Sequence, residues 1–160
     1  FGDSYNQDEL RKYTKEFLQK YYAENKVPVK KGLYSLLDFL KQINCKMAVA
    51  SSSPRWEVEK HLKEANIYEY FTGIVCGDMV QNSKPDPEIY LKACEELGVN
   101  PCDAIGIEDS INGVKSSSAA GLYTIMVVDL IQPTQEIQLL AKQIYDSLFD
   151  VMDLLKEGII

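Results

Sequence analysis

Residues 104–113 have the sequence Ala104-Ile105-Gly106-Ile107-Glu108-Asp109-Ser110-Ile111-Asn112-Gly113, an apolar run followed by two adjacent carboxylates. The apolar run predicts a buried strand, and Asp109 and Ser110 suit the start of a following helix. Two neighbouring carboxylates at the end of a buried strand repel each other and lose hydration. A hard divalent cation such as Mg²⁺ would relieve that cost, whereas the purely structural alternative is an acidic helix N-terminus. Glu108 and Asp109 are therefore candidate metal ligands.

Short apolar strands alternate with amphipathic helices along most of the chain. Apolar runs predict strands at residues 47–50, 74–76, 104–107, 123–128 and 143–145. Apolar periodicity and helix-ending residues predict helices at residues 8–25, 33–43, 54–65, 87–97, 111–120 and 148–156. This alternation implies parallel crossover connections, so we expect an α/β fold with a doubly wound parallel sheet.

Two further polar clusters lie where predicted strands give way to helices. Ser51-Ser52-Ser53 follows the strand at 47–50, and its hydroxyls and amides suit an anion site or, more simply, a helix cap with Ser53 as N-cap. Lys84 lies in the loop Ser83-Lys84-Pro85-Asp86-Pro87, whose two prolines restrict its turns, and Asp86 is the expected cap of the next helix. Its ammonium is suited to neutralise a phosphoryl group, although a loop lysine can equally be solvated. Ligands gather at the carboxyl ends of strands in such sheets, so we expect the three clusters to converge.

The overall charge and the cysteines exclude several classes of function. Acidic residues outnumber basic residues by 24 to 17, giving a net charge of −7 that disfavours nucleic acid and anionic membranes as partners. The four cysteines include no C-x-x-C pair, which argues against a zinc site. All four lie in or beside apolar segments, so we expect them to be buried and reduced, as in a cytoplasmic protein.

The order of the three clusters resembles the second, third and fourth motifs of the haloacid dehalogenase-like (HAD) superfamily. The strand followed by serine, then Lys-Pro-Asp-Pro-Glu-Ile-Tyr, then Ile-Gly-Ile-Glu-Asp-Ser-Ile-Asn-Gly is most similar to its phosphatase and β-phosphoglucomutase-like members. The resemblance covers the chain from about Val29 to the C-terminus. It implies a HAD-like Rossmannoid core that transfers phosphoryl groups with Mg²⁺ as its cofactor.

The resemblance also implies a role for each matching residue. Ser51 matches the hydroxyl that binds the transferring phosphoryl group, assisted by the backbone amide of Ser52. Lys84 matches the catalytic lysine that stabilises the phosphoryl group and the nucleophile. Asp109 matches a magnesium-coordinating carboxylate, and Glu108 matches the acidic neighbour in or next to the metal shell.

One motif of the superfamily has no counterpart here. No Asp-x-Asp follows a buried strand, although that motif supplies the nucleophile and the general acid and base of the family. Residues 1–26 resemble the C-terminal helix of a helical cap, and residues 27–160 resemble a core without its central first strand. We therefore expect the nucleophile to lie upstream, the chain alone to be inactive, and a companion N-terminal segment or association to complete the sheet.

Three functions are compatible with these residues. The leading expectation is a phosphatase of a small phosphorylated metabolite acting through an aspartyl-phosphate, with Arg55 near enough to the serine cluster to contact substrate. The first alternative is a sugar phosphomutase of the β-phosphoglucomutase kind. The second alternative is a non-catalytic phosphate-binding module.

Overall fold

Parallel strands and helices alternate along the chain, as expected from the sequence. The computed structural model describes residues 6–24 and 28–158. Its α-helices are α1 (Gln7–Glu24), α2 (Leu33–Gln42), α3 (Arg55–Glu64), α4 (Glu88–Leu97), α5 (Ile111–Ala119), α6 (Gln135–Leu140) and α7 (Leu148–Lys156). Its strands are β1 (Ala48–Ser51), β2 (Gly73–Cys76), β3 (Ile105–Glu108), β4 (Tyr123–Val127) and β5 (Gln143–Tyr145).

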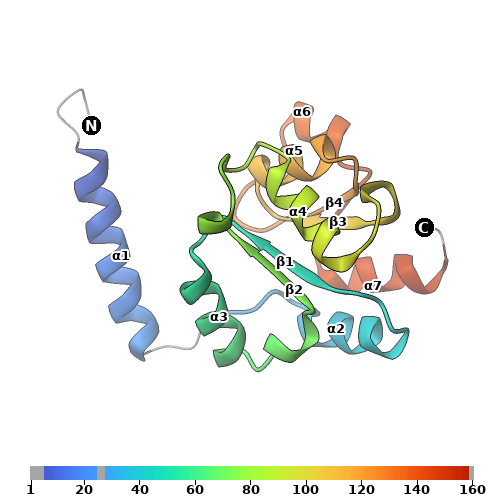
Figure 1. The fold of residues 1–160 in the computed structure, drawn as a ribbon, viewed down its shortest axis with the longest axis horizontal. Coiled ribbons are helices and arrows are strands. Elements are labelled where there is room, and N and C mark those ends of the chain that lie inside the picture. Colours follow the sequence, from blue (N-terminus) through green and yellow to red (C-terminus); the bar gives the residue numbers. More distant parts are fainter. Residues whose placement is uncertain (1–5, 25–27, 159–160) are drawn as a thin grey trace.

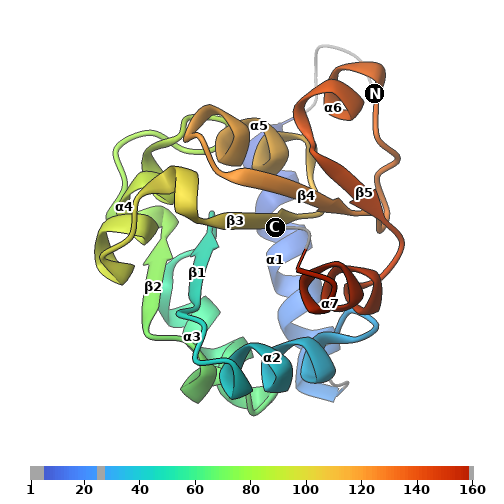
Figure 2. The ribbon, with the colours of Figure 1, turned by 90° about the vertical axis from the view of Figure 1, so that its right-hand side faces the viewer.

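The strands form two parallel sheets (Figures 1 and 2). β1 pairs with β2, with Ala48 opposite Gly73, and β4 pairs with β3 on one side and β5 on the other. The predicted α/β fold with parallel strands is confirmed. Within the described residues, however, no ladder joins β1 to β3, so the sheet is divided between these two strands.

Helices cover both faces of each sheet. Ile125 and Val127 of β4 pack against α2 and α7, whereas Met126 packs on the opposite face against α5 and α6. In the smaller sheet, Ile74 and Cys76 face α2 and α3, and the other face is covered by α4. Figure 2 shows α5 and α6 on one side of β4 and α7 on the other. The fold is therefore doubly wound, with helices on both sides of the strands.

Helix α2 connects the two halves of the molecule. Leu37 belongs to the core beneath β1 and β2, whereas its neighbour Leu36 belongs to the core beneath β4. Leu33 and Leu40 pack against both cores. On the faces of the two sheets that α2 does not cover, α4 contacts α5. These helices hold the two sheets together without a shared strand ladder.

Local structure differs from the sequence-based expectation at two helix starts and in one helix. Pro54 rather than Ser53 is the N-cap of α3, and the carboxylate of Asp78 accepts from the Arg55 amide at 3.2 Å. The side chain of Asp86 does accept from the Glu88 amide at 3.0 Å, but α4 begins at Glu88. Helix α6 was not predicted, because six residues with one buried apolar side chain give too little periodicity.

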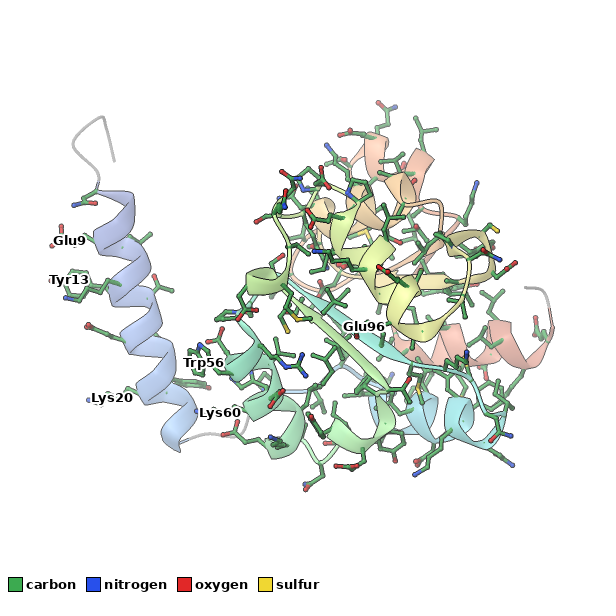
Figure 3. The ribbon with its side chains drawn as sticks, viewed as in Figure 1. Glu9, Tyr13, Lys20, Trp56, Lys60 and Glu96 are labelled. Atoms are coloured by element: carbon green, nitrogen blue, oxygen red, sulfur yellow. The ribbon has the colours of Figure 1, made fainter. Side chains whose placement is uncertain are left out.

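Helix α1 stands apart from the rest of the molecule in Figure 1. Its predicted apolar stripe is exposed rather than packed, with Tyr13 62% and Phe17 67% accessible. Figure 3 shows Tyr13 on the side of α1 that points away from the core and Trp56 of α3 on the side nearer α1. The expected boundary between residues 26 and 27 lies outside the described residues, so the assignment of α1 to a cap remains a prediction.

The prediction that all four cysteines are buried is wrong for two of them. Cys76 and Cys94 are buried, but Cys45 and Cys102 are exposed, because Cys45 lies in the connection between α2 and β1 and Cys102 lies in the one-turn 3-10 helix η3 (Pro101–Asp103) before β3. Among the helices of the described residues, none combines the length and the apolar composition needed to cross a membrane.

Gly106 brings β3 close to α5. A Cβ at this position would lie 2.0 Å from Ser117 Oγ, and Ser117 is fully buried with its hydroxyl 2.8 Å from Thr124 Oγ1. Ser117 therefore has little room to move. We expect Gly106→Ala to lower the free energy of unfolding by about 1–3 kcal/mol in urea denaturation. Ser118→Ala, the next position on α5, is the control and should leave the urea midpoint unchanged; equal midpoints for both variants would contradict this packing.

Candidate active site

Lys84 joins the two halves of the divided sheet. Its Nζ donates to the main-chain oxygen of Ala50 in β1 at 3.0 Å and to Oε1 of Glu108 at the end of β3. The side chains of Lys84 and Glu108 are only 10% and 8% exposed. An ammonium has three donors, so this geometry leaves one N–H of Lys84 for a ligand.

Glu108 is held by more than its ion pair. Its Oε1 also accepts from the hydroxyl of Tyr90 in α4, and its Oε2 accepts from Ser110 Oγ at 3.3 Å. Burial and the neighbouring Glu108 carboxylate raise the pKa of Tyr90, so the phenol stays protonated and donating. A Cβ at Gly113 would lie 1.8 Å from Oε2, so the glycine allows the carboxylate to fit against α5.

The loop that presents Lys84 is fixed at both ends. Ser116 Oγ of α5 donates to the main-chain oxygen of Asp86 at 2.6 Å. On the other side of the loop, the carboxylate of Glu88 accepts from the amides of Gln81 and Asn82. The Gln81 amide, Lys92 and the Asn82 amide lower the pKa of Glu88 to about 2. Lys84 is therefore presented by a loop that side-chain hydrogen bonds anchor on both sides.

The serine cluster forms a tight turn after β1. Ser51 Oγ accepts from the Ser53 amide at 3.2 Å, which leaves the hydroxyl hydrogen of Ser51 available for donation. The turn also packs closely against Gly77, because a Cβ there would lie 2.2 Å from the main-chain oxygen of Ser52. This contact fixes the peptide between Ser52 and Ser53.

A cavity of about 470 Å³ opens between these loops. It is lined by Ser52, Lys84, Ser110, Ile111, Asn112 and Ile131. Ser52 of the serine cluster and Lys84 therefore share one cavity with the start of α5, whereas Ser51, Glu108 and Asp109 are not among its lining residues. Asn112 and Ile131, which the sequence-based site did not include, line the same space.

Asp109 follows Glu108 in the sequence, but its carboxylate pairs with Lys30 and not with Lys84. Its Oδ2 is 3.1 Å from Nζ of Lys30, which is also 2.5 Å from Oδ2 of Asp129 beyond β4. Partial burial lowers the pKa of Lys30, but the hydrogen bonds to Asp129 and Asp109 outweigh it and the net shift is upward. No sequence signal had connected Lys30 or Asp129 to the site.

Arg55 is directed along its own helix. Its Nε is 2.8 Å from Oε1 of Glu59 one turn later, and its NH1 is 3.8 Å from the sulfur of Met79. Arg55 follows the serine turn by two residues, but these contacts engage its guanidinium away from Lys84 and Glu108. A substrate contact by Arg55 remains a prediction.

The side chains of the site supply only part of a Mg²⁺ coordination shell. In the described ranges, no three His, Cys, Asp or Glu side chains are grouped closely enough to hold a metal ion. Mg²⁺ usually takes one or two protein carboxylates and completes its shell with water and phosphate oxygens. Asp109, with a side chain 44% exposed, fits as one such ligand. Glu108 accepts from three side chains already, and so fits as the acidic neighbour of the shell.

The sequence pattern of the haloacid dehalogenase-like hydrolase family matches residues 1–127. This chain belongs to that family. A phosphorylated carbohydrates phosphatase of Thermotoga maritima is 40% identical over 94 residues, which cover 59% of this chain and 44% of that protein. Curated relatives such as this one are therefore matched over about half of their own length.

Solved structures of HAD enzymes share the fold. The crystal structure of CbbY from Rhodobacter sphaeroides in complex with phosphate matches 94% of this chain and 68% of that one, with a TM-score of 0.78 and 27% identity. A β-phosphoglucomutase from Clostridium difficile matches 98% and 71%, with a TM-score of 0.72 and 25% identity. The HAD-like α/β fold expected from the sequence is thus confirmed.

The ion pair between Lys84 and Glu108 provides a stability test. Glu108→Gln leaves the buried ammonium without its counter-charge, so we expect the free energy of unfolding to fall by about 3 kcal/mol. Glu59→Gln removes the partner of two exposed cations, Arg55 and Lys63, and should have a much smaller effect. Urea unfolding of both variants checks this, and a similar loss in each would show that burial of the Lys84 pair is unimportant.

Proposed function

We propose that this chain forms most of the core of a Mg²⁺-dependent phosphatase that acts on a small phosphorylated metabolite. The observation that supports this best is the position of Lys84, whose Nζ contacts the strand that precedes the serine turn and the carboxylate next to Asp109. Anion-binding and metal-binding groups from three loops are therefore adjacent. The phosphatases and β-phosphoglucomutase-like enzymes among the relatives support the same class of reaction.

The phosphoryl group would bind between the serine turn and Lys84. The hydroxyl of Ser51 and the amide of Ser52 would each donate to a phosphoryl oxygen. The free N–H of Lys84 would donate to another and offset the charge that develops there during transfer. Glu108 and Tyr90 would keep the ammonium charged and in place. In this proposal the attacking carboxylate, which becomes the aspartyl-phosphate, belongs to a segment outside this chain.

Asp109 would hold Mg²⁺ at the edge of this site, with Glu108 beside the shell. When bound, Mg²⁺ would supply positive charge that offsets the phosphate oxygens. We further propose a cytoplasmic location, which the four free cysteines of the chain support.

The divided sheet provides a place for a companion strand. Within the described residues β1 and β3 each have one unpaired edge, and Ile105 and Ile107 of β3 are 37% and 36% exposed. Ile125, which lies opposite Ile107, is fully buried. Unpaired edges of strands readily accept another strand. We propose that a segment N-terminal to this chain pairs with both edges and brings the nucleophile to Lys84. A second copy of this chain would complete the sheet without supplying a nucleophile, because the chain has no Asp-x-Asp after a strand.

A sugar phosphomutase is the second candidate, because it would use the same residues. Phosphorus NMR of the full-length protein with glucose 1-phosphate separates the two: release of inorganic phosphate supports a phosphatase, and isomerisation supports a mutase. A third outcome, phosphate binding without turnover of any ester, would support the non-catalytic binding module instead.

Asp109 provides the direct test of the metal site. In the full-length protein we expect Asp109→Asn to lower kcat for para-nitrophenyl phosphate by about 100-fold or more, because Mg²⁺ loses its ligand. The exposed carboxylate of Asp153 on α7 is the matched control, and Asp153→Asn should leave turnover unchanged. Unaltered turnover and Mg²⁺ dependence in Asp109→Asn would remove Asp109 from the metal site.

Hydrogen exchange followed by mass spectrometry tests whether a companion strand pairs with β1 and β3. We expect amides at the unpaired edges of β1 and β3 to exchange much faster in residues 1–160 alone than in the full-length protein, because the added strand protects them. Peptides from β4, which is paired on both sides, should be protected in both samples. A monomeric 160-residue chain with equally slow exchange at all three strands would contradict this part of the proposal.

A further inference from the structure

Lys30 lies between two carboxylates at the ends of neighbouring strands. Its Nζ is 3.1 Å from Asp109 Oδ2 and 2.5 Å from Asp129 Oδ2. Asp109 follows β3 and Asp129 follows β4, so both are at the carboxyl ends of the sheet where ligands gather. The two carboxylate oxygens are no farther apart than the sum of those distances.

The backbone around Lys30 is fixed against α7. The main-chain oxygen of Lys31 accepts from the Leu148 amide at 3.1 Å. Gly32 has a φ of 89°, and a Cβ there would lie 2.7 Å from the Phe149 nitrogen, so this turn needs glycine. The Lys30 side chain is 31% exposed. Its position is therefore set by tertiary contacts, unlike that of an ordinary surface lysine.

We propose that Lys30 is a positioning residue that holds Asp129 away from the metal ion and so makes the Asp109 site selective for Mg²⁺ over Ca²⁺. This inference rests on the proposed function. Lys30 neutralises Asp129 and keeps its carboxylate from joining the coordination shell, while it orients one oxygen of Asp109. The site then offers a metal ion few carboxylates, and the remaining ligands are water and phosphate oxygens.

The selectivity follows from the different demands of the two ions. Mg²⁺ requires compact octahedral geometry and retains waters, whereas Ca²⁺ accepts six to eight oxygens and gains from each additional carboxylate. Two oxygens bound to one Ca²⁺ lie up to about 5 Å apart, which is comparable with the separation that Lys30 now bridges. Without the ammonium, Asp129 and Asp109 are free to close on a single Ca²⁺.

The test is calorimetric titration of the full-length protein with MgCl₂ and with CaCl₂, with no substrate present. We expect Lys30→Met to tighten Ca²⁺ binding by about tenfold and Mg²⁺ binding by much less, as for other changes beside a metal ligand. Lys30→Arg keeps a cation between the carboxylates and should retain the wild-type ratio of the two affinities. Lys31→Met removes the same charge one residue away and should also retain that ratio.

A double variant tests whether Asp129 causes the tighter Ca²⁺ binding expected of Lys30→Met. Asp129→Asn in the Lys30→Met background should restore the wild-type ratio, because the additional ligand is gone. An unchanged ratio in Lys30→Met, or a double variant that behaves like Lys30→Met, would overturn the inference while leaving Mg²⁺ binding at Asp109 intact. Mg²⁺ binding unaffected by Asp109→Asn would instead overturn the proposed metal site, and this inference with it.

Discussion

The buried ammonium of Lys84 is the constraint on which the site depends. A charge that is only 10% exposed is costly unless every neighbour compensates it. Here the compensation comes from the main-chain oxygen of Ala50 and the carboxylate of Glu108, which Tyr90 in turn orients. These partners belong to β1, β3 and α4, so the lysine is satisfied only while the two sheets keep their relative position.

Helices rather than strand ladders maintain that position. On one side, α2 places adjacent leucines into the cores of both sheets. On the other side, α4 contacts α5, and Ser116 of α5 holds the loop that carries Lys84. The division of the sheet between β1 and β3 therefore coincides with the place where the polar groups meet. A reactive group brought between these strands would lie beside Lys84.

Much of the architecture was predictable because it depends on local pattern. The bounds of α7 were predicted correctly, and those of β2 and β4 to within one residue, since apolar runs and periodicity mark such elements. The failures come from tertiary contacts, which local pattern does not contain. Ser53 does not cap α3, because Asp78 from another loop satisfies the Arg55 amide. The stripe on α1 has the right period for a helix, but periodicity does not reveal whether a partner is present.

The sequence by itself determined the family resemblance, the positions of the strands along the chain and the three polar clusters, because these depend on residue types at short spacing. Only the tertiary structure decided what each polar group contacts. Tyr90 is buried on the apolar side of α4 with Ile89 and Ala93, yet its hydroxyl donates to Glu108. Lys30 had no recognisable motif, yet it binds Asp109 and Asp129. Partners so distant along the chain are brought together by helix packing, which no local pattern encodes.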